Sequence, residues 1–143
     1  AGTLINGMDC MIVVRRDGNN QQSLGGLYQL DETKYFGVIG TDSGISAGTH
    51  GGCGTPSIFV DNVAVSNTRG ALYDAIGLGE LHILEYRDLD MSAWVNAGFG
   101  YYSSGYQLIG ARGDIMLYPS TTPTEDKDAA RQWLADYYGV TLP

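Results

Sequence analysis

The most constraining feature of this sequence is a single amphipathic helix pattern at the end of a chain that otherwise shows strand and turn patterns. It falls within residues 113–143, where a strand, a short polar loop and the helix follow one another. Apolar residues in the helix recur at spacings of three and four, which gives one apolar stripe: Ala129, Ala130, Trp133, Leu134 and Tyr137. We therefore predict a mostly β protein with one short C-terminal helix, and expect Trp133 to dock on the sheet.

Both ends of this helix carry sequence signals. Thr122 is expected to cap the first amides, Pro123 suits the first helical position, and Glu125 completes a capping box. Gly139 follows the last apolar residue, as a left-handed C-terminal cap requires. The pattern predicts a packing helix with no direct role in chemistry.

Strand patterns fill most of the remaining chain. Residues 8–16 alternate, so that Cys10, Ile12 and Val14 face one side while Met11, Val13 and Arg15 face the other. Residues 58–65 predict a hairpin with a two-residue turn at Asp61-Asn62. Residues 80–87 alternate as a further strand, whereas 69–76 fit either a strand or a helical turn. Short strands at regular spacing followed by one helix indicate a sandwich.

Length and charge restrict the class of protein. A chain of 143 residues with 43% apolar residues suits a single domain, 1–143. Its 16 acidic and 8 basic residues give a net charge of −8, which argues against nucleic-acid partners. No apolar run is long enough for membrane insertion. Cys10 and Cys53 are expected to be free thiols, and the start at Ala1 suggests the C-terminal fragment of a longer protein.

The end block, Gly-Asp-Ile-Met-Leu-Tyr-Pro followed by Tyr-Gly-Val-Thr-Leu-Pro, resembles the closing segment of concanavalin A-like (laminin-G-type) jelly-roll domains. It is most similar to those of phage tail and virion-surface proteins. The hairpin at 58–65 and the strand at 80–85 are similar to that family's central strands. The resemblance implies an antiparallel β-sandwich, a homotrimer, and a place at the virion surface or tail tip after synthesis in the host cytoplasm.

Two groups of residues are candidates for ligand binding. One is a stretch in which aromatic residues alternate with small polar residues, and the other is the predicted hairpin turn. Rings stack on the C–H faces of sugars while polar side chains meet their hydroxyls. We therefore list as candidate glycan contacts Asp61, Asn62, Trp94, Tyr101 and Tyr106. The same rings are equally compatible with a subunit interface or with plain sheet packing. The expected partner is a bacterial surface polysaccharide.

No catalytic constellation emerges from the sequence. Glu80 and Glu85 are five residues apart, so a regular strand points them to opposite faces, while Glu85 and Arg87 predict a surface charge pair. His82 is expected to be a satisfied structural histidine. The resemblance implies a host-surface or receptor-binding tip module of a phage tail fibre, needle or spike, and because no catalytic pattern emerges we expect it to be non-enzymatic, with no cofactor and only calcium left open. The alternatives are a structural or oligomerisation domain and a glycoside hydrolase.

Overall fold

The computed structural model describes residues 6–18, 53–94 and 108–143 in full, and the backbone of six two-residue strands elsewhere in the chain. The longer strands are β1 (Asn6–Arg16), β7 (Ser57–Val60), β8 (Val63–Val65), β9 (Leu81–Asp90) and β11 (Gly110–Pro119). The helices are α1 (Arg69–Ala75) and α2 (Thr124–Tyr138). The two-residue strands are β2 (Gln22–Ser23), β3 (Leu27–Tyr28), β4 (Tyr35–Phe36), β5 (Val38–Ile39), β6 (Thr49–His50) and β10 (Gly98–Phe99).

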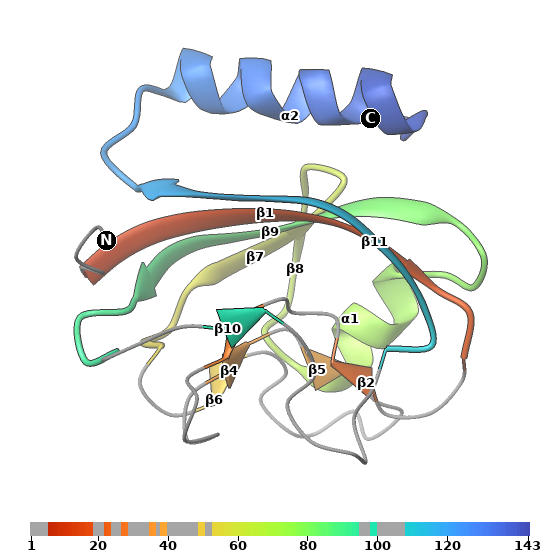
Figure 1. The fold of residues 1–143 in the computed structure, drawn as a ribbon, viewed down its shortest axis with the longest axis horizontal. Helices are drawn as coiled ribbons and strands as arrows, with labels where there is room; N and C mark the ends of the chain where they lie inside the picture. Colours follow the sequence, from red (N-terminus) through yellow and green to blue (C-terminus); the bar gives the residue numbers. More distant parts are fainter. Residues whose placement is uncertain are drawn as a thin grey trace.

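The five longer strands form one antiparallel sheet in the order β11-β1-β9-β7-β8. The alternation predicted for residues 8–16 is confirmed, because neighbouring residues of β1 belong to two different cores. The sheet is therefore buried on both faces, and α2 covers one of them (Figure 1).

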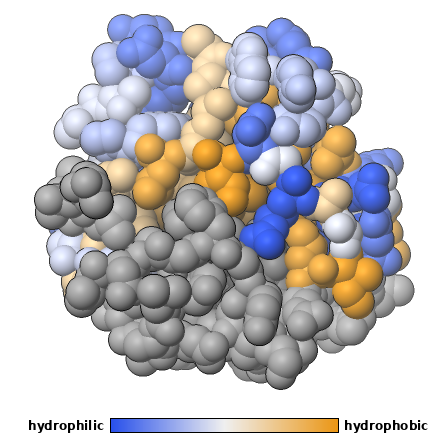
Figure 2. All heavy atoms as spheres, in the orientation of Figure 1, coloured by the Kyte–Doolittle hydropathy of each residue, from blue (hydrophilic) through white to orange (hydrophobic). Residues whose placement is uncertain are grey.

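The core under α2 is the smaller of the two. Met11, Val13 and Ile83 of the sheet pack there against Leu134 and Ala135 of α2, and all five side chains are buried. On the face shown in Figure 2, hydrophilic side chains gather over α2 and apolar side chains over the sheet below it. The helix thus covers an apolar face of the sheet, as the sequence predicts for a packing helix.

The larger core lies on the opposite face of the sheet. Its sheet residues include Cys10, Ile12 and Leu84, and Leu72 of α1 packs with them. Cys53 joins this core as well; it and Cys10 are buried and not joined by a disulfide, as expected. α1 begins at Thr68, whose Oγ1 accepts a hydrogen bond from the Ala71 amide at 3.2 Å.

The short strands form a four-stranded sheet, β10-β3-β4-β6, and a two-stranded sheet, β2-β5, on the side of the main sheet away from α2 (Figure 1). The structure confirms the mostly β class, the antiparallel sheet and the C-terminal helix. For residues 69–76, which fitted either a strand or a helical turn, the helical alternative is confirmed, so the described residues contain a second helix, α1. The jelly-roll sandwich stays a prediction. Within the described residues, neither helix has the length and apolar character needed to cross a bilayer.

Two buried ion pairs attach α2 to the sheet. Glu85 of β9 is 1% exposed and accepts hydrogen bonds from Arg131 at 3.0 and 3.1 Å and from Arg87 at 2.9 and 3.0 Å. Lys127 donates to Asp9 of β1 at 2.7 Å. The predicted pairing of Glu85 with Arg87 is confirmed, but its predicted place at the surface is wrong, because α2 covers Glu85 and supplies a second arginine.

These pairs determine which face of α2 meets the sheet. Arg131 and Leu134 point inward, so Trp133 and Tyr137 point outward and are 50% and 69% exposed. The prediction that Trp133 docks on the sheet is wrong for this reason. The helix also starts one residue later than predicted, with Pro123 at the N-cap and no side-chain cap, while Gly139 forms the predicted left-handed C-cap at φ 70°.

Acid sensitivity is a direct consequence of the buried Glu85. Burial alone would raise its pKa, but the hydrogen bonds and charges of Arg87 and Arg131 hold that pKa below its usual range. Because the folded-state pKa is lowered, the stabilisation is complete above the ordinary carboxyl pKa of 4.5 and is lost as pH falls through the lowered value.

We therefore expect the stability difference between the wild type and Glu85→Gln to be largest near neutral pH and to narrow on acidification. Denaturant unfolding at a series of pH values measures this difference. A difference that stays constant down to strongly acidic pH would contradict the assigned ion pairs.

Candidate functional site

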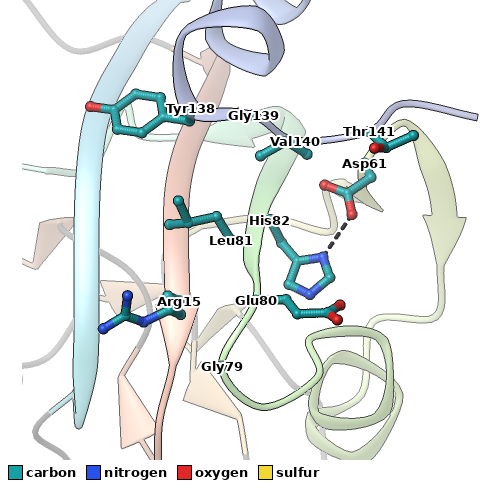
Figure 3. Close-up of a pocket in the computed structure, with 10 residues that line it drawn as sticks. All are labelled: Arg15, Asp61, Gly79, Glu80, Leu81, His82, Tyr138, Gly139, Val140 and Thr141. Atoms are coloured by element: carbon teal, nitrogen blue, oxygen red, sulfur yellow. Dashed lines mark hydrogen bonds and ion pairs between the residues drawn. The ribbon is translucent and has the colours of Figure 1, made fainter.

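A polar pocket lies where α2 ends, close to the start of β9 and the β7–β8 hairpin (Figure 3). Its volume is about 440 Å³. It is lined by Arg15, Asp61, Gly79, Glu80, Leu81, His82, Tyr138, Gly139, Val140 and Thr141. We call this set of residues the polar pocket.

The hairpin turn places Asp61 in this pocket. Asp61 and Asn62 have φ values of 50° and 67°, as a two-residue turn of the type I′ class requires, and Val60 pairs with Val63. The Asp61 amide donates to the Ile83 carbonyl at 2.9 Å, and Asp61 Oδ1 accepts from the Ile83 amide at 2.8 Å. The predicted hairpin is confirmed, and its tip is fixed to β9.

His82 is held by Asp61 but only through one ring nitrogen. Nδ1 lies 2.7 Å from Asp61 Oδ2, and the side chain is 12% exposed. Since a carboxylate only accepts hydrogen bonds, the neutral ring carries its proton on Nδ1 and leaves a lone pair on Nε2. Nε2 is buried and has no hydrogen-bond partner among the described residues. His82 is therefore half satisfied, which the sequence-based interpretation of a satisfied histidine misses.

The tautomer of His82 is directly measurable. In the neutral ring we expect Nδ1 to carry the proton, because the Asp61 carboxylate accepts a hydrogen bond from it. Ring-nitrogen NMR shifts distinguish the two tautomers, and Asp61→Asn should weaken the preference. A wild-type ring protonated mainly on Nε2 would contradict the assigned hydrogen bond.

The remaining polar groups of the pocket are mainly acceptors. Glu80 is exposed and forms no ion pair with any described residue. Arg15 is already engaged by Asp17 at 3.0 and 3.3 Å, and this hydrogen bonding raises the pKa of Arg15. The acceptor open to a ligand is thus the Glu80 carboxylate, with the Thr141 hydroxyl able to accept or donate, while His82 Nε2 is buried. Such a pocket matches a ligand that presents several hydrogen-bond donors.

Gly139 shapes the pocket through its backbone. Its φ of 70° and ψ of 30° end α2 in the left-handed conformation, and the Val140 amide then donates to the Ala135 carbonyl at 2.9 Å. The chain turns back at this point, and Val140 and Thr141 line the pocket (Figure 3). A side chain at Gly139 would meet no atom within 4 Å, so the backbone angle is the reason for glycine.

Exposed aromatic rings continue from the wall of the pocket along α2. Tyr138 lines the pocket and its hydroxyl donates to Asp114 Oδ2 at 3.1 Å. The Tyr138 ring meets Tyr137 edge-on at 5.0 Å, and Tyr137 stacks on Trp133 at 5.4 Å with an interplanar angle of 15°. We call Trp133 and Tyr137 the aromatic pair. The aromatic pair is thus solvent-facing and is linked to the wall of the polar pocket through the Tyr138 ring.

Of the three predicted candidate residues that the structure describes, Asp61 alone lines the pocket. Asn62 is exposed at the turn and its Oδ1 accepts from Arg87 at 3.3 Å. Trp94 is 6% exposed and belongs to the larger core, which fits the packing alternative for this ring. Tyr101 and Tyr106 lie outside the described residues.

Some of the pocket residues that the sequence analysis did not select carry a signal in the sequence, and others do not. Glu80 and His82 are two residues apart, and that spacing could have placed both side chains on one side of the strand. Thr141 and Tyr138 carry no such signal, because their place depends on how α2 lies on the sheet. Within the described ranges, no group of three His, Cys, Asp or Glu side chains is arranged to hold a metal ion.

Comparison of the chain with protein-family models, with curated proteins and with solved structures returned no match. The likeness to concanavalin A-like phage domains therefore rests on the sequence motifs alone and stays a prediction.

Proposed function

We propose that this protein is a non-catalytic carbohydrate-binding module, and that its site combines the polar pocket with the aromatic pair. The observation that carries the proposal is the exposed Glu80 carboxylate, which has no ion-pair partner among the described residues, in an acceptor-lined pocket beside exposed, stacked rings. Sugar hydroxyls supply the donors that these acceptors need, and a sugar C–H face suits an exposed aromatic ring.

The charge of the pocket narrows the class of sugar. Asp61 and Glu80 are both acidic, Arg15 is paired with Asp17, and the whole chain carries a net charge of −8. A carboxylated or phosphorylated sugar would meet like charge in this pocket, which is unfavourable at short range. The proposed ligand is therefore a neutral saccharide.

The hydrogen bonding of the acids supports binding over hydrolysis. A glycosidase needs two carboxyl groups that act on one bond. Both oxygens of Asp61 are engaged, by the Ile83 amide and by His82, and Glu85 is held by two arginines. Glu80 is then the one pocket carboxylate without a described partner. A bacterial polysaccharide as the source of the sugar, and a virion tail tip as the location, remain predictions from the resemblance.

The test is a glycan array screened with the intact chain, followed by affinity measurements on the best neutral saccharide. Glu80→Gln should weaken that binding roughly tenfold, because it removes a charge-assisted hydrogen bond at an exposed side chain. Glu125→Gln makes the same change roughly 20 Å away along α2 and should leave the affinity unchanged. No bound neutral saccharide, or equal effects of the two variants, would contradict the proposal.

The exposed aromatic pair also favours a second candidate, a structural domain that binds other copies of this chain. Tryptophan and tyrosine are enriched in the centres of such interfaces. Light scattering on the wild type and on Trp133→Ala separates the two functions. A wild-type oligomer that dissociates in the variant would support the structural domain, whereas an unchanged mass would support the aromatic pair as a free ligand surface.

A further inference from the structure

A second hollow lies next to the polar pocket, beside the β7–β8 hairpin, and most of the side chains that line it are apolar. Its volume is about 440 Å³ and its lining is Val60, Asp61, Val63, Val65, Ala75, Thr141 and Pro143. We call it the apolar hollow. Val63 is 52% exposed, so an apolar surface is open to solvent at this place.

The two sites are in direct contact. Asp61 and Thr141 line both of them, and these two residues lie next to each other in Figure 3. On one side lies the acceptor Glu80, and on the other lie valine, alanine and proline side chains. A single ligand that reaches past Thr141 would therefore meet a polar site and an apolar site at once.

We propose that the two hollows form one bipartite site for a neutral saccharide that carries an alkyl or acyl substituent. This inference rests on the proposed saccharide-binding function of the polar pocket. The sugar hydroxyls meet Glu80 and Thr141, and the substituent removes apolar surface of Val63, Val65 and Pro143 from water. No covalent change is involved.

Two features next to the apolar hollow favour this ligand over an anionic lipid or a second copy of the chain: the acidic side chains of the polar pocket and the shortness of strand β8. A free fatty acid or a phosphate-bearing lipid would place its anionic head against Asp61 and Glu80, which is unfavourable. A pairing strand from a second copy would find only the three residues of β8 at this edge of the sheet. An uncharged, hydroxyl-rich head with an apolar tail fits both halves.

The experiment compares methyl and hexyl β-glycosides of glucose, galactose, mannose and N-acetylglucosamine, each below its critical micelle concentration, on the intact chain by calorimetry. Each buried methylene should raise the affinity roughly three- to fourfold, so at least one hexyl glycoside should bind more than about tenfold tighter than its methyl counterpart. Hexanol serves as the probe for the tail alone.

Matched variants assign the gain to the apolar hollow. Val63→Thr keeps the branched shape at an exposed position. It should reduce severalfold the ratio of hexyl to methyl glycoside affinity, while the affinity for the methyl glycoside stays unchanged. Ala64→Ser is the control, since Ala64 is exposed on the same strand but does not line the apolar hollow.

The outcomes separate this inference from the proposed function. Equal binding of methyl and hexyl glycosides overturns the bipartite site and leaves the saccharide function intact. Hexanol that binds as tightly as the hexyl glycosides, or a panel in which nothing binds, overturns both. If the hexyl glycosides bind more tightly than the methyl glycosides and Val63→Thr does not reduce this difference, the assignment of the alkyl chain to the apolar hollow is overturned.

Discussion

Replacing Arg131 by methionine should lower the free energy of unfolding by about 3 kcal/mol, the loss expected when one partner of a buried ion pair is removed. Glu85 is 1% exposed and receives two hydrogen bonds from Arg131. In the variant, Glu85 keeps Arg87 but loses the charge that compensates its burial under α2. Urea unfolding measures the change, and the melting temperature should fall by roughly 10 °C.

Two controls make this result specific to the buried pair. Asp128→Asn removes the other partner of Arg131, but Asp128 is 61% exposed, so the loss should stay below about 1 kcal/mol. The double variant Glu85→Met/Arg131→Met should recover much of the stability, because it leaves no buried charge of the pair unpaired. A double variant less stable than Arg131→Met would contradict this explanation.

Replacing both members of the aromatic pair by alanine should weaken saccharide binding at least about thirtyfold, since exposed tryptophan and tyrosine in a binding site contribute roughly 2 kcal/mol or more. Trp133 and Tyr137 are 50% and 69% exposed and pack mainly on each other. The double variant should therefore fold with nearly wild-type stability. Calorimetric titration with the saccharide selected on the array gives the affinity, and urea unfolding checks the fold.

The exposed Gln132 provides a matched control for the pair. Gln132→Ala also shortens a side chain on the outer part of α2, where its amide donates to Asp136 at 2.8 Å, but it removes no ring. Its affinity should equal that of the wild type. If the double aromatic variant binds as well as Gln132→Ala, the aromatic pair has no part in ligand binding.

The local patterns of the sequence predicted the longer strands and the C-terminal end of the last helix well, whereas the predicted N-terminal cap at Thr122 was wrong. The alternation in residues 8–16, the turn at Asp61-Asn62 and the cap at Gly139 follow from backbone preferences of a few neighbouring residues. All three are confirmed. These features do not depend on how distant elements pack.

The orientation of α2 could not be predicted in the same way. Its most apolar stripe included Trp133 and Tyr137, but the sheet below offers Glu85 and Asp9, which require Arg131 and Lys127 opposite them. Buried charges must be paired, so these partners determine the rotation of the helix and outweigh the apolar stripe. Pairs that are far apart in the sequence leave no local pattern.

The candidate site was predicted least well for a related reason. The helix was expected to carry no site, yet its C-terminal end lines the polar pocket and its outer face presents the aromatic pair. Asp61 was identified from its hairpin turn. Its partner His82 is 21 residues away in the sequence, and the two side chains meet only because β9 pairs with β7.

The most direct test of the proposed binding site is an amide NMR titration of the intact chain with the neutral saccharide selected on the array. The largest shifts are expected at Gly79, His82, Gly139 and Thr141, which line the polar pocket. Smaller shifts are expected at the aromatic pair and none at Asn62, which lies outside that pocket. Shifts confined to residues outside the polar pocket and the aromatic pair would contradict the proposed binding site.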